Sequence, residues 1–275
     1  MSRQHGFTLV ELAIVLVLVT ILIGGLAAPL SAQIQARRIA ETRAEMQAIQ
    51  DALLGYAMGH TLGRACTCNY DGSGVQDVSS DCPGSLCPLT STPGNSFGLS
   101  YVRHHLPCPD TNNDGREEAR DGGGSCPSLR GGLPWITLGV RGHDAWGNRY
   151  TYAASLTFTN DQNGFRSTPT ADEGTLNVHP DPSCAAASVA EKAVAVVVSH
   201  GPNGRGAQNA SGGTPLGLAS VPLPERLNLP NAVAASPCTS ASFVSTTPSD
   251  TFDDLVVWLS GPALFNRVCP TGGCQ

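Results

Sequence analysis

Charge is scarce in this sequence of 275 residues, because only 14% of them are Asp, Glu, Lys or Arg. Soluble domains carry about 25%. Lysine is almost absent, with Lys192 as the single copy, and 16 basic against 22 acidic residues give a formal net charge of −6. A general nucleic-acid-binding protein presents a basic field. The composition therefore argues against a nucleic acid as a partner.

Glycine, proline and cysteine are abundant instead, with 31, 20 and 10 copies. The glycines and prolines predict many turns and loops. Ten cysteines in a loop-rich chain indicate disulfide bonds and an oxidising compartment. A cytosolic enzyme is therefore not expected.

Residues 7–28 form an apolar run interrupted by Thr8, Glu11 and Thr20. As a helix, 22 residues would extend about 33 Å, which matches a hydrocarbon core of about 30 Å. A cleaved signal peptide is the alternative, but its apolar region normally has about 7–15 residues and contains no carboxylate. We therefore predict a membrane-spanning helix over 7–28, preceded by a leader over 1–6.

Glu11 is the informative residue of this run. A carboxylate within a membrane is costly and needs a partner, and the run itself contains no cation. Cleavage after Gly6 would create an α-amino group on Phe7. In an apolar bundle this cation could pair with Glu11 of a neighbouring subunit, where the pair would be weakly screened.

The segment Gly6-Phe7-Thr8-Leu9-Val10-Glu11-Leu12 resembles the prepilin motif of type IV pilins and type II secretion pseudopilins. The resemblance implies that a prepilin peptidase cleaves after Gly6 and methylates the amine of Phe7, and that Glu11 sets subunit register in a filament. It also implies three further properties. The partners would be other pilin subunits and an inner-membrane assembly platform. The chain would cross the bacterial inner membrane once, and its C-terminal domain would lie in the periplasm or on an extracellular filament.

The apolar run continues into an amphipathic segment over 29–60. Its apolar residues recur at helical spacing, which predicts one helical stripe that packs on a globular domain over 61–275. The stripe consists of Ile39, Met46, Ile49, Leu53 and Tyr56. Strands are expected over 149–158, 193–199 and 255–259. The predicted fold is α+β and pilin-like: a long N-terminal helix packed on a small antiparallel sheet with long disulfide-rich loops.

The cysteines divide into two groups. Residues 61–105 are expected to be irregular and contain Cys66, Cys68, Cys82 and Cys87, whose spacing also suits a four-thiolate zinc site. In an oxidising compartment, disulfides among these four are favoured. For the other six, short-range pairing predicts Cys108–Cys126, Cys184–Cys238 and Cys269–Cys274.

Residues 110–121 resemble the first half of a calcium-binding loop. Asp110, Asn112 and Asp114 place oxygen ligands on alternate residues before Gly115, and Asp121 stands at the twelfth position. The alternative is an acidic, solvated turn.

A second calcium site follows from a further resemblance. The order Asp-x-Trp-Gly-x-x-Tyr, then Val-Ser-His-Gly-Pro-Asn-Gly, then Asp-Asp-Leu-x-x-Trp is similar to the globular domain of major pseudopilins. That resemblance implies calcium in the loop between the last two strands, with Ser199, Asn203, Asp253 and Asp254 as ligands. Asn203 stands where the family commonly has Asp, and residues 207–250 form a long insertion.

No catalytic site is expected. The candidates are His104, His105 and the pair Ser199 and His200, but neighbouring residues on a strand point to opposite faces. The departures from the pseudopilin pattern at Asn203 and over 207–250 instead favour a minor or specialised filament subunit. The first alternative is a displayed binding or adhesion pilin whose loops at 61–105 or 207–250 recognise a surface or a ligand. A membrane-anchored hydrolase is the second.

Overall fold

The computed structural model describes residues 8–70, 76–78, 96–165, 173–212, 220–232 and 237–269. For residues 22–30, 61–70, 76–78 and 96–102 it describes the backbone alone. Gly6, Phe7, Cys82, Cys87 and Cys274 lie outside the described residues. The predictions made for them stay predictions, as do those for the side chains of Cys66 and Cys68.

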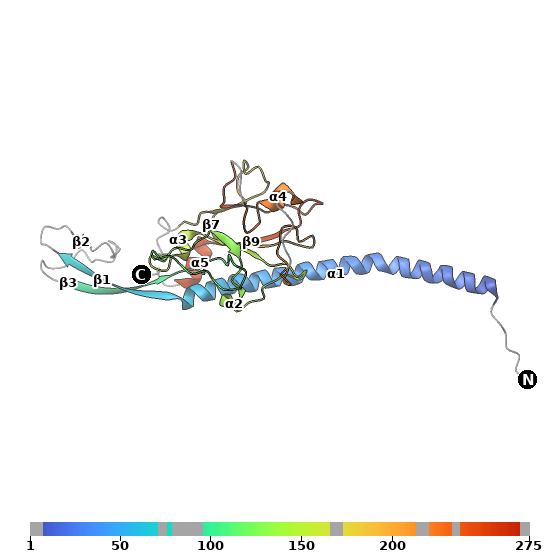
Figure 1. Cartoon of the computed structure of the whole chain (residues 1–275), viewed down its shortest axis with the longest axis horizontal. Coiled ribbons are helices and arrows are strands. Elements are labelled where there is room, and N and C mark those ends of the chain that lie inside the picture. Colours follow the sequence, from blue (N-terminus) through green and yellow to red (C-terminus); the bar gives the residue numbers. More distant parts are fainter. Residues whose placement is uncertain are drawn as a thin grey trace, which may run out of the picture.

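Helix α1 (Leu9–Gly59) is the longest element and runs without interruption for 51 residues. The predicted stripe is confirmed from Met46 to Tyr56, because Met46, Ile49, Leu53 and Tyr56 are buried, while Ile39 at its start is half-buried. The first half of α1 extends alone, far beyond the body of the molecule (Figure 1). Its large apolar side chains are exposed there; Leu9, for example, is 90% exposed. Among the described residues, no helix is both long and apolar enough to cross a membrane.

The body of the molecule contains a six-stranded sheet in the order β4-β5-β7-β6-β8, with β9 also paired to β7. Four short helices accompany it. The strands are β4 (Arg130–Gly132), β5 (Thr151–Ala154), β6 (Leu176–His179), β7 (Ala190–Ser199), β8 (Ser242–Val244) and β9 (Leu255–Ser260). The helices are α2 (Trp135–Leu138), α3 (Leu156–Thr159), α4 (Leu223–Arg226) and α5 (Gly261–Val268).

The pairing is mostly antiparallel, as predicted, but β6 and β8 run parallel. The expected strands over 193–199 and 255–259 are confirmed as β7 and β9. The strand expected over 149–158 is only partly correct, because β5 ends at Ala154 and α3 follows. The chain turns at Ser155, and Phe158 enters an aromatic cluster with Phe165 and Phe265 instead of extending the sheet.

Two apolar cores lie on the two faces of the sheet. The larger joins α1 and α5 to one face through residues such as Leu53, Tyr152 and Leu264. The smaller covers the other face and includes Val196 and Phe243. The α+β class is therefore confirmed, and the buried side of the second half of α1 is fixed by this packing.

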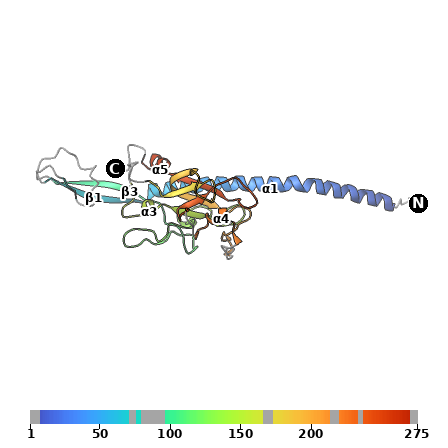
Figure 2. The same cartoon turned by 90° about the horizontal axis from the view of Figure 1, so that it is seen from above.

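A long antiparallel arm corrects the prediction of an irregular segment over 61–105. Strand β1 (Thr61–Tyr70) pairs with β3 (Ser96–His104) from Thr61↔His104 to Asn69↔Ser96, and with the short β2 (Gln76–Val78). Both views show the arm extending from the body on the side opposite the N-terminus (Figures 1 and 2). Alternating apolar residues at 97, 99 and 101 signal this strand, but the surrounding cysteines and glycines conceal the pattern.

Candidate functional site

Glu11 lies in the first turn of α1 and is held by Thr8, the residue that caps the helix. The backbone N–H and the hydroxyl of Thr8 each donate to Glu11 Oε2 at 2.9 Å, and the Glu11 N–H donates to Thr8 Oγ1 at 3.3 Å. This reciprocal capping box gives the carboxylate two donors without any cation. The sequence predicts a cationic partner for Glu11 from outside the apolar run. A local hydrogen-bond partner could also be predicted, because a Thr three residues before a Glu is the sequence signature of a capping box.

Three carboxylates converge where α4 meets the start of β9. One oxygen from each of Glu225, Asp253 and Asp254 lies within 4.8 Å of the others. Glu225 and Asp254 are buried, with exposed fractions of 0% and 5%. In the part of the chain that the structure describes, no other group of three or more His, Cys, Asp or Glu side chains converges in this way.

Each of these carboxylates has one oxygen held by amide donors. Glu225 Oε1 accepts from the side-chain amide of Asn203 at 2.7 Å and from the backbone N–H of Asp253 at 3.3 Å. Asp253 Oδ2 accepts from the Asn203 N–H at 3.0 Å, and Asp254 Oδ2 accepts from the Asn228 side chain at 2.8 Å. These donors fix the orientation of the carboxylates, as outer-shell groups do around metal ligands.

The other oxygen of each carboxylate is buried without a hydrogen-bond partner in the described part of the chain: Glu225 Oε2, Asp253 Oδ1 and Asp254 Oδ1. One guanidinium approaches, since Arg205 Nη1 lies 3.9 Å from Glu225 Oε2. A single positive charge at that distance leaves three clustered carboxylates undercompensated. Carboxylate oxygens that lie within 4.8 Å of one another are hard donors of the kind that Ca²⁺ takes, so the residues fit this ion.

Burial also changes the titration of the cluster. Burial, together with the nearby Glu225 carboxylate, raises the pKa of Asp253 to about 6. Burial raises the pKa of Asp254 well above its usual range. The His200 Nδ1 lies 3.8 Å from Asp254 Oδ1, but burial lowers the pKa of His200 to about 4 and keeps the ring neutral near pH 7. No imidazolium therefore compensates the cluster.

Arg130 positions the segment that supplies Glu225. Its guanidinium is buried and donates to four backbone carbonyls while it stacks on the ring of Phe243 at 3.9 Å. The acceptors are the carbonyls of Leu227, Leu229, Ser240 and Ser242. Burial lowers the pKa of Arg130 to about 9, which still leaves it charged near pH 7. One side chain thus joins β4 to α4 and β8.

The structure brings together only part of the second predicted calcium set. Asp253 and Asp254 point into the cluster, but the Ser199 hydroxyl donates to Asp144 at 2.7 Å and lies in another hydrogen-bond network. Asn203 turns its amide nitrogen toward Glu225 and its carbonyl oxygen toward the Arg205 N–H. Ser199 and Asn203 are thus not placed as metal ligands. The third carboxylate of the cluster is Glu225, the only acidic residue over 207–249.

The first predicted calcium loop satisfies its oxygens internally. Asp110 is 1% exposed and accepts from the N–H groups of Asn112, Asn113 and Gly115 at 2.6–3.1 Å. Asn112 and Asp114 each accept a backbone N–H in the same turn. Asp121 caps a separate turn by accepting from Gly123 and Ser125. These side chains shape two turns and do not converge on a common point.

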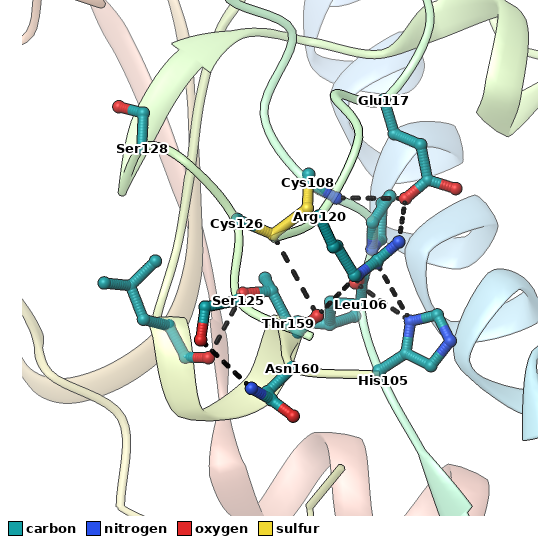
Figure 3. The surroundings of a disulfide bond; sticks show 12 residues. His105, Leu106, Cys108, Glu117, Arg120, Ser125, Cys126, Ser128, Thr159 and Asn160 are labelled. Carbon is teal, nitrogen blue, oxygen red and sulfur yellow. Dashed lines mark hydrogen bonds and ion pairs between the residues drawn. A yellow bond between two sulfur atoms is a disulfide. The ribbon is translucent and has the colours of Figure 1, made fainter. Parts of the chain in front are cut away.

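A disulfide between Cys108 and Cys126 closes the loop that contains Asp110. Figure 3 shows the Arg120 guanidinium between Glu117 and His105, beside this bond. Arg120 forms an ion pair with Glu117 at 2.9 Å. The Tyr56 hydroxyl of α1 donates to Glu117 at 2.6 Å, so the closed loop is anchored on the helix.

The predicted pairs Cys108–Cys126 and Cys184–Cys238 are confirmed. Cys269 is also disulfide-bonded, as its predicted pairing requires. The candidate catalytic histidines have separate contacts, since His104 Nδ1 lies 2.8 Å from the Ala57 carbonyl and His200 Nε2 lies 2.8 Å from Thr151 Oγ1.

One segment of the chain, at its N-terminus, matches a known protein family. Residues 1–27 match the family model of the prokaryotic N-terminal methylation motif, which is the signature of type IV pilins and pseudopilins. No curated protein matches the chain, and no solved structure does.

Proposed function

We propose that this chain, whose first 27 residues carry the type IV pilin and pseudopilin signature, is a structural subunit of a helical filament. The filament would be a type II secretion pseudopilus or a type IV pilus, and the long insertion at 207–250 suggests a minor or specialised position in it. The single observation that carries the proposal is the methylation motif in front of an exposed apolar helix.

In this proposal, a prepilin peptidase removes residues 1–6 and methylates the new amine of Phe7. The subunit is held in the inner membrane by its apolar helix until an assembly platform moves it into the filament. There, the amine of one copy meets Glu11 of the next. The exposed apolar side chains from Leu9 to Ile21 support this step, because only a membrane or neighbouring helices would remove them from water.

Calcium would have a structural part in this function. Glu225, Asp253 and Asp254 would hold the ion, and its charge would neutralise the carboxylates that burial otherwise penalises. The ion would then join the insertion at 207–250 to the start of β9. We propose no enzymatic activity, since the work of such a subunit is assembly.

Two measurements on protein from native membranes test the proposal. The first is the mass of the mature N-terminus, which should begin at Phe7 and carry one extra methyl group. The second is the assembly of a Glu11→Ala variant, which should be cleaved normally but fail to enter filaments. Native subunits that keep residues 1–6 within filaments, or normal incorporation of Glu11→Ala, would contradict the proposal.

The arm favours the second candidate function, a displayed binding or adhesion pilin. It extends from the body opposite the N-terminus, so it would project from a filament end (Figure 1). The register Gly63↔Val102 allows the arm to be shortened by joining these residues through an Asn-Gly turn. Filaments with the shortened arm should assemble normally but lose attachment to surfaces. Unchanged attachment would contradict the binding role of the arm, and only the structural role would remain.

A further inference from the structure

A cavity of about 380 Å³ lies between β4, at the edge of the sheet, the loop that contains Asp110, and the insertion at 207–250. Small-molecule sites occupy about 300–1,000 Å³, so this one suits a small ligand. Its floor is buried, whereas its rim is exposed to solvent. The floor includes Arg130, Thr151 and His200, and the rim includes Asn113 and Asn231.

The charged groups of this cavity are already compensated or engaged. Burial lowers the pKa of Arg149, and the negative charge of the nearby Asp110 opposes this shift, so the two charges offset each other. Asp110 itself accepts three backbone N–H groups. The Arg130 guanidinium donates to four backbone carbonyls, and His200 is neutral near pH 7. We therefore expect an uncharged ligand.

Three side-chain amides of the lining are free to bind such a ligand. Within the described residues, no hydrogen bond engages the side chains of Asn113, Gln208 and Asn231. Each amide presents N–H donors beside a carbonyl acceptor. A hydroxyl group both donates and accepts, so neighbouring hydroxyls on a ligand match an amide. Gln208 and Asn231 both belong to the insertion, which thus forms one wall of the cavity.

Arg149 adds further donors beside these amides. Its guanidinium stacks on the ring of Trp135 at 3.8 Å, which fixes the plane of its N–H groups. It donates to the carbonyls of Gly142 and Ala210, but these bonds are long, at 3.4 and 3.5 Å. A guanidinium has five N–H donors, so others remain available to a ligand oxygen.

We infer that this cavity binds a small uncharged saccharide, whose hydroxyl groups pair with the free amides and with Arg149. A sugar ring also has apolar C–H faces, and the lining supplies apolar surface from Tyr150, Ala207 and Pro230. The inference deepens the second candidate function, a displayed binding pilin, because it names a class of ligand. It places recognition in the body of the molecule instead of on the arm.

Binding of the full-length chain to a printed saccharide array tests the inference. The chain is kept in a detergent without a sugar headgroup, and the array carries neutral, N-acetylated and acidic mono- to trisaccharides. We expect binding to uncharged members, and calorimetric titration with the strongest of them in free form gives the Kd. Gln208→Ala and Asn231→Ala each remove one amide and should weaken binding about fivefold. Asn231→Trp fills the exposed rim and should abolish binding.

Three further variants serve as controls. Gln47→Ala and Asn266→Trp make the same changes at exposed positions outside the cavity and should keep the wild-type affinity. The chain with the arm shortened between Gly63 and Val102 should keep it too, because the cavity lies in the body.

The possible outcomes separate the cavity from the arm and from assembly. An absence of wild-type binding, binding to acidic saccharides alone, or unchanged affinity in all the cavity variants overturns the inference. Loss of binding in the shortened-arm chain, with retention in the cavity variants, assigns the saccharide to the arm and also overturns it. None of these results bears on filament assembly, which the Glu11→Ala variant tests separately. A chain that binds the saccharide in the cavity but assembles normally as Glu11→Ala contradicts the filament proposal and supports the cavity.

Discussion

A carboxylate oxygen of Glu225, from the long insertion, lies within 4.8 Å of one from Asp253, at the start of β9. The two acids are 28 residues apart in the sequence, and the Asp253 N–H donates to Glu225 directly. A contact between two acidic side chains is unfavourable unless a cation or a proton compensates it. This relationship leads to predictions on pH, metal and mutation.

The stability of the metal-free protein should depend on the protonation of this cluster. Burial raises the pKa of Asp253 to about 6 and raises that of Asp254 as well. A carboxyl whose pKa is higher in the folded state favours folding when protonated, so this contribution to stability is lost as the pH rises through about 6. His200 has the opposite effect, because its lowered pKa of about 4 costs stability on acidification. Scanning calorimetry with calcium chelated should therefore show that the Tm of the wild type rises relative to that of Asp253→Asn when the pH is lowered from about 7.5 to about 5.

Calcium should reverse this dependence, because the ion binds the ionised carboxylates and competes with protons. The Asp253→Asn variant provides the control, since it lacks the contribution of Asp253 and keeps that of His200. A metal-free wild-type Tm that falls on acidification as steeply as that of Asp253→Asn would contradict the assignment.

The substitution Glu225→Gln should separate the two effects of this carboxylate. It keeps the shape of the side chain but removes one buried charge, so the metal-free protein should be at least as stable as the wild type. Calcium should no longer raise the Tm, whereas a wild-type site at 100 times its Kd gains about 2.7 kcal/mol. Glu191→Gln, on the exposed start of β7, should keep the full calcium response. A full response in Glu225→Gln would exclude this residue as a ligand.

Arg130 should be indispensable for holding Glu225 in place. Arg130→Met removes a donor from four backbone carbonyls, of which that of Leu229 keeps the N–H of Ala232, and this loss should lower the free energy of unfolding by about 3 kcal/mol or more. Calcium affinity should fall too, because α4 loses its attachment to β4. Arg116→Met, at an exposed position, should change stability by less than about 0.5 kcal/mol. Denaturant unfolding and calcium titration measure both effects, and wild-type affinity in Arg130→Met would contradict the positioning role.

Periodicity made much of the fold predictable. The stripe from Ile39 to Tyr56 fixes the buried side of α1, and the valine run over 193–199 marks the central strand. The end of β5 was not predictable, because the burial of Phe158 in the aromatic cluster competes with extension of the strand. That competition depends on Phe165 and Phe265, which no local pattern connects to Phe158.

The candidate site was predictable only in part. The resemblance of Asp-Asp-Leu-x-x-Trp to major pseudopilins implies Asp253 and Asp254 as ligands, and the structure places both in the cluster. Glu225 comes from an insertion without periodicity, where it is the only acidic residue over 207–249 and Arg226 is the only basic one. At Asp110 the acidic spacing also resembles a metal loop, whereas in the structure its oxygens accept backbone N–H groups of the turn.

Removal of the two described disulfides should destabilise the body by different amounts. In the chain-entropy model, opening the shorter loop with Cys108→Ser and Cys126→Ser costs about 3 kcal/mol, and opening the longer one with Cys184→Ser and Cys238→Ser costs about 4 kcal/mol. The sequence separations are 18 and 54 residues. Urea unfolding of each double variant measures these differences.

The shorter loop should have a further effect, because it carries Glu117, which accepts from Tyr56 of α1. Hydrogen exchange near Tyr56 should accelerate in the variant without Cys108 and Cys126, and should stay unchanged in the variant without Cys184 and Cys238. Equal acceleration in both would show that the loop does not anchor the helix.

The capping box makes Thr8 a determinant of assembly. Its hydroxyl both donates to Glu11 and accepts from the Glu11 N–H, so it orients the carboxylate before any neighbour arrives. Thr8→Val preserves the shape but removes the hydroxyl, and Thr8→Ser retains it. We expect Thr8→Val to lower the yield of assembled subunit several-fold and Thr8→Ser to assemble normally. Filament yield from equal amounts of membrane-inserted subunit measures the effect.

Processing must be separated from assembly in this experiment, because Thr8 lies two residues after the proposed cleavage position. The mature mass of each variant shows whether the leader has been removed and the amine methylated. A Thr8→Val subunit that is fully processed yet poorly assembled places the defect at Glu11. Normal assembly of that processed subunit would show that the carboxylate needs no local orientation, and the amine of the neighbouring copy would then suffice to position it.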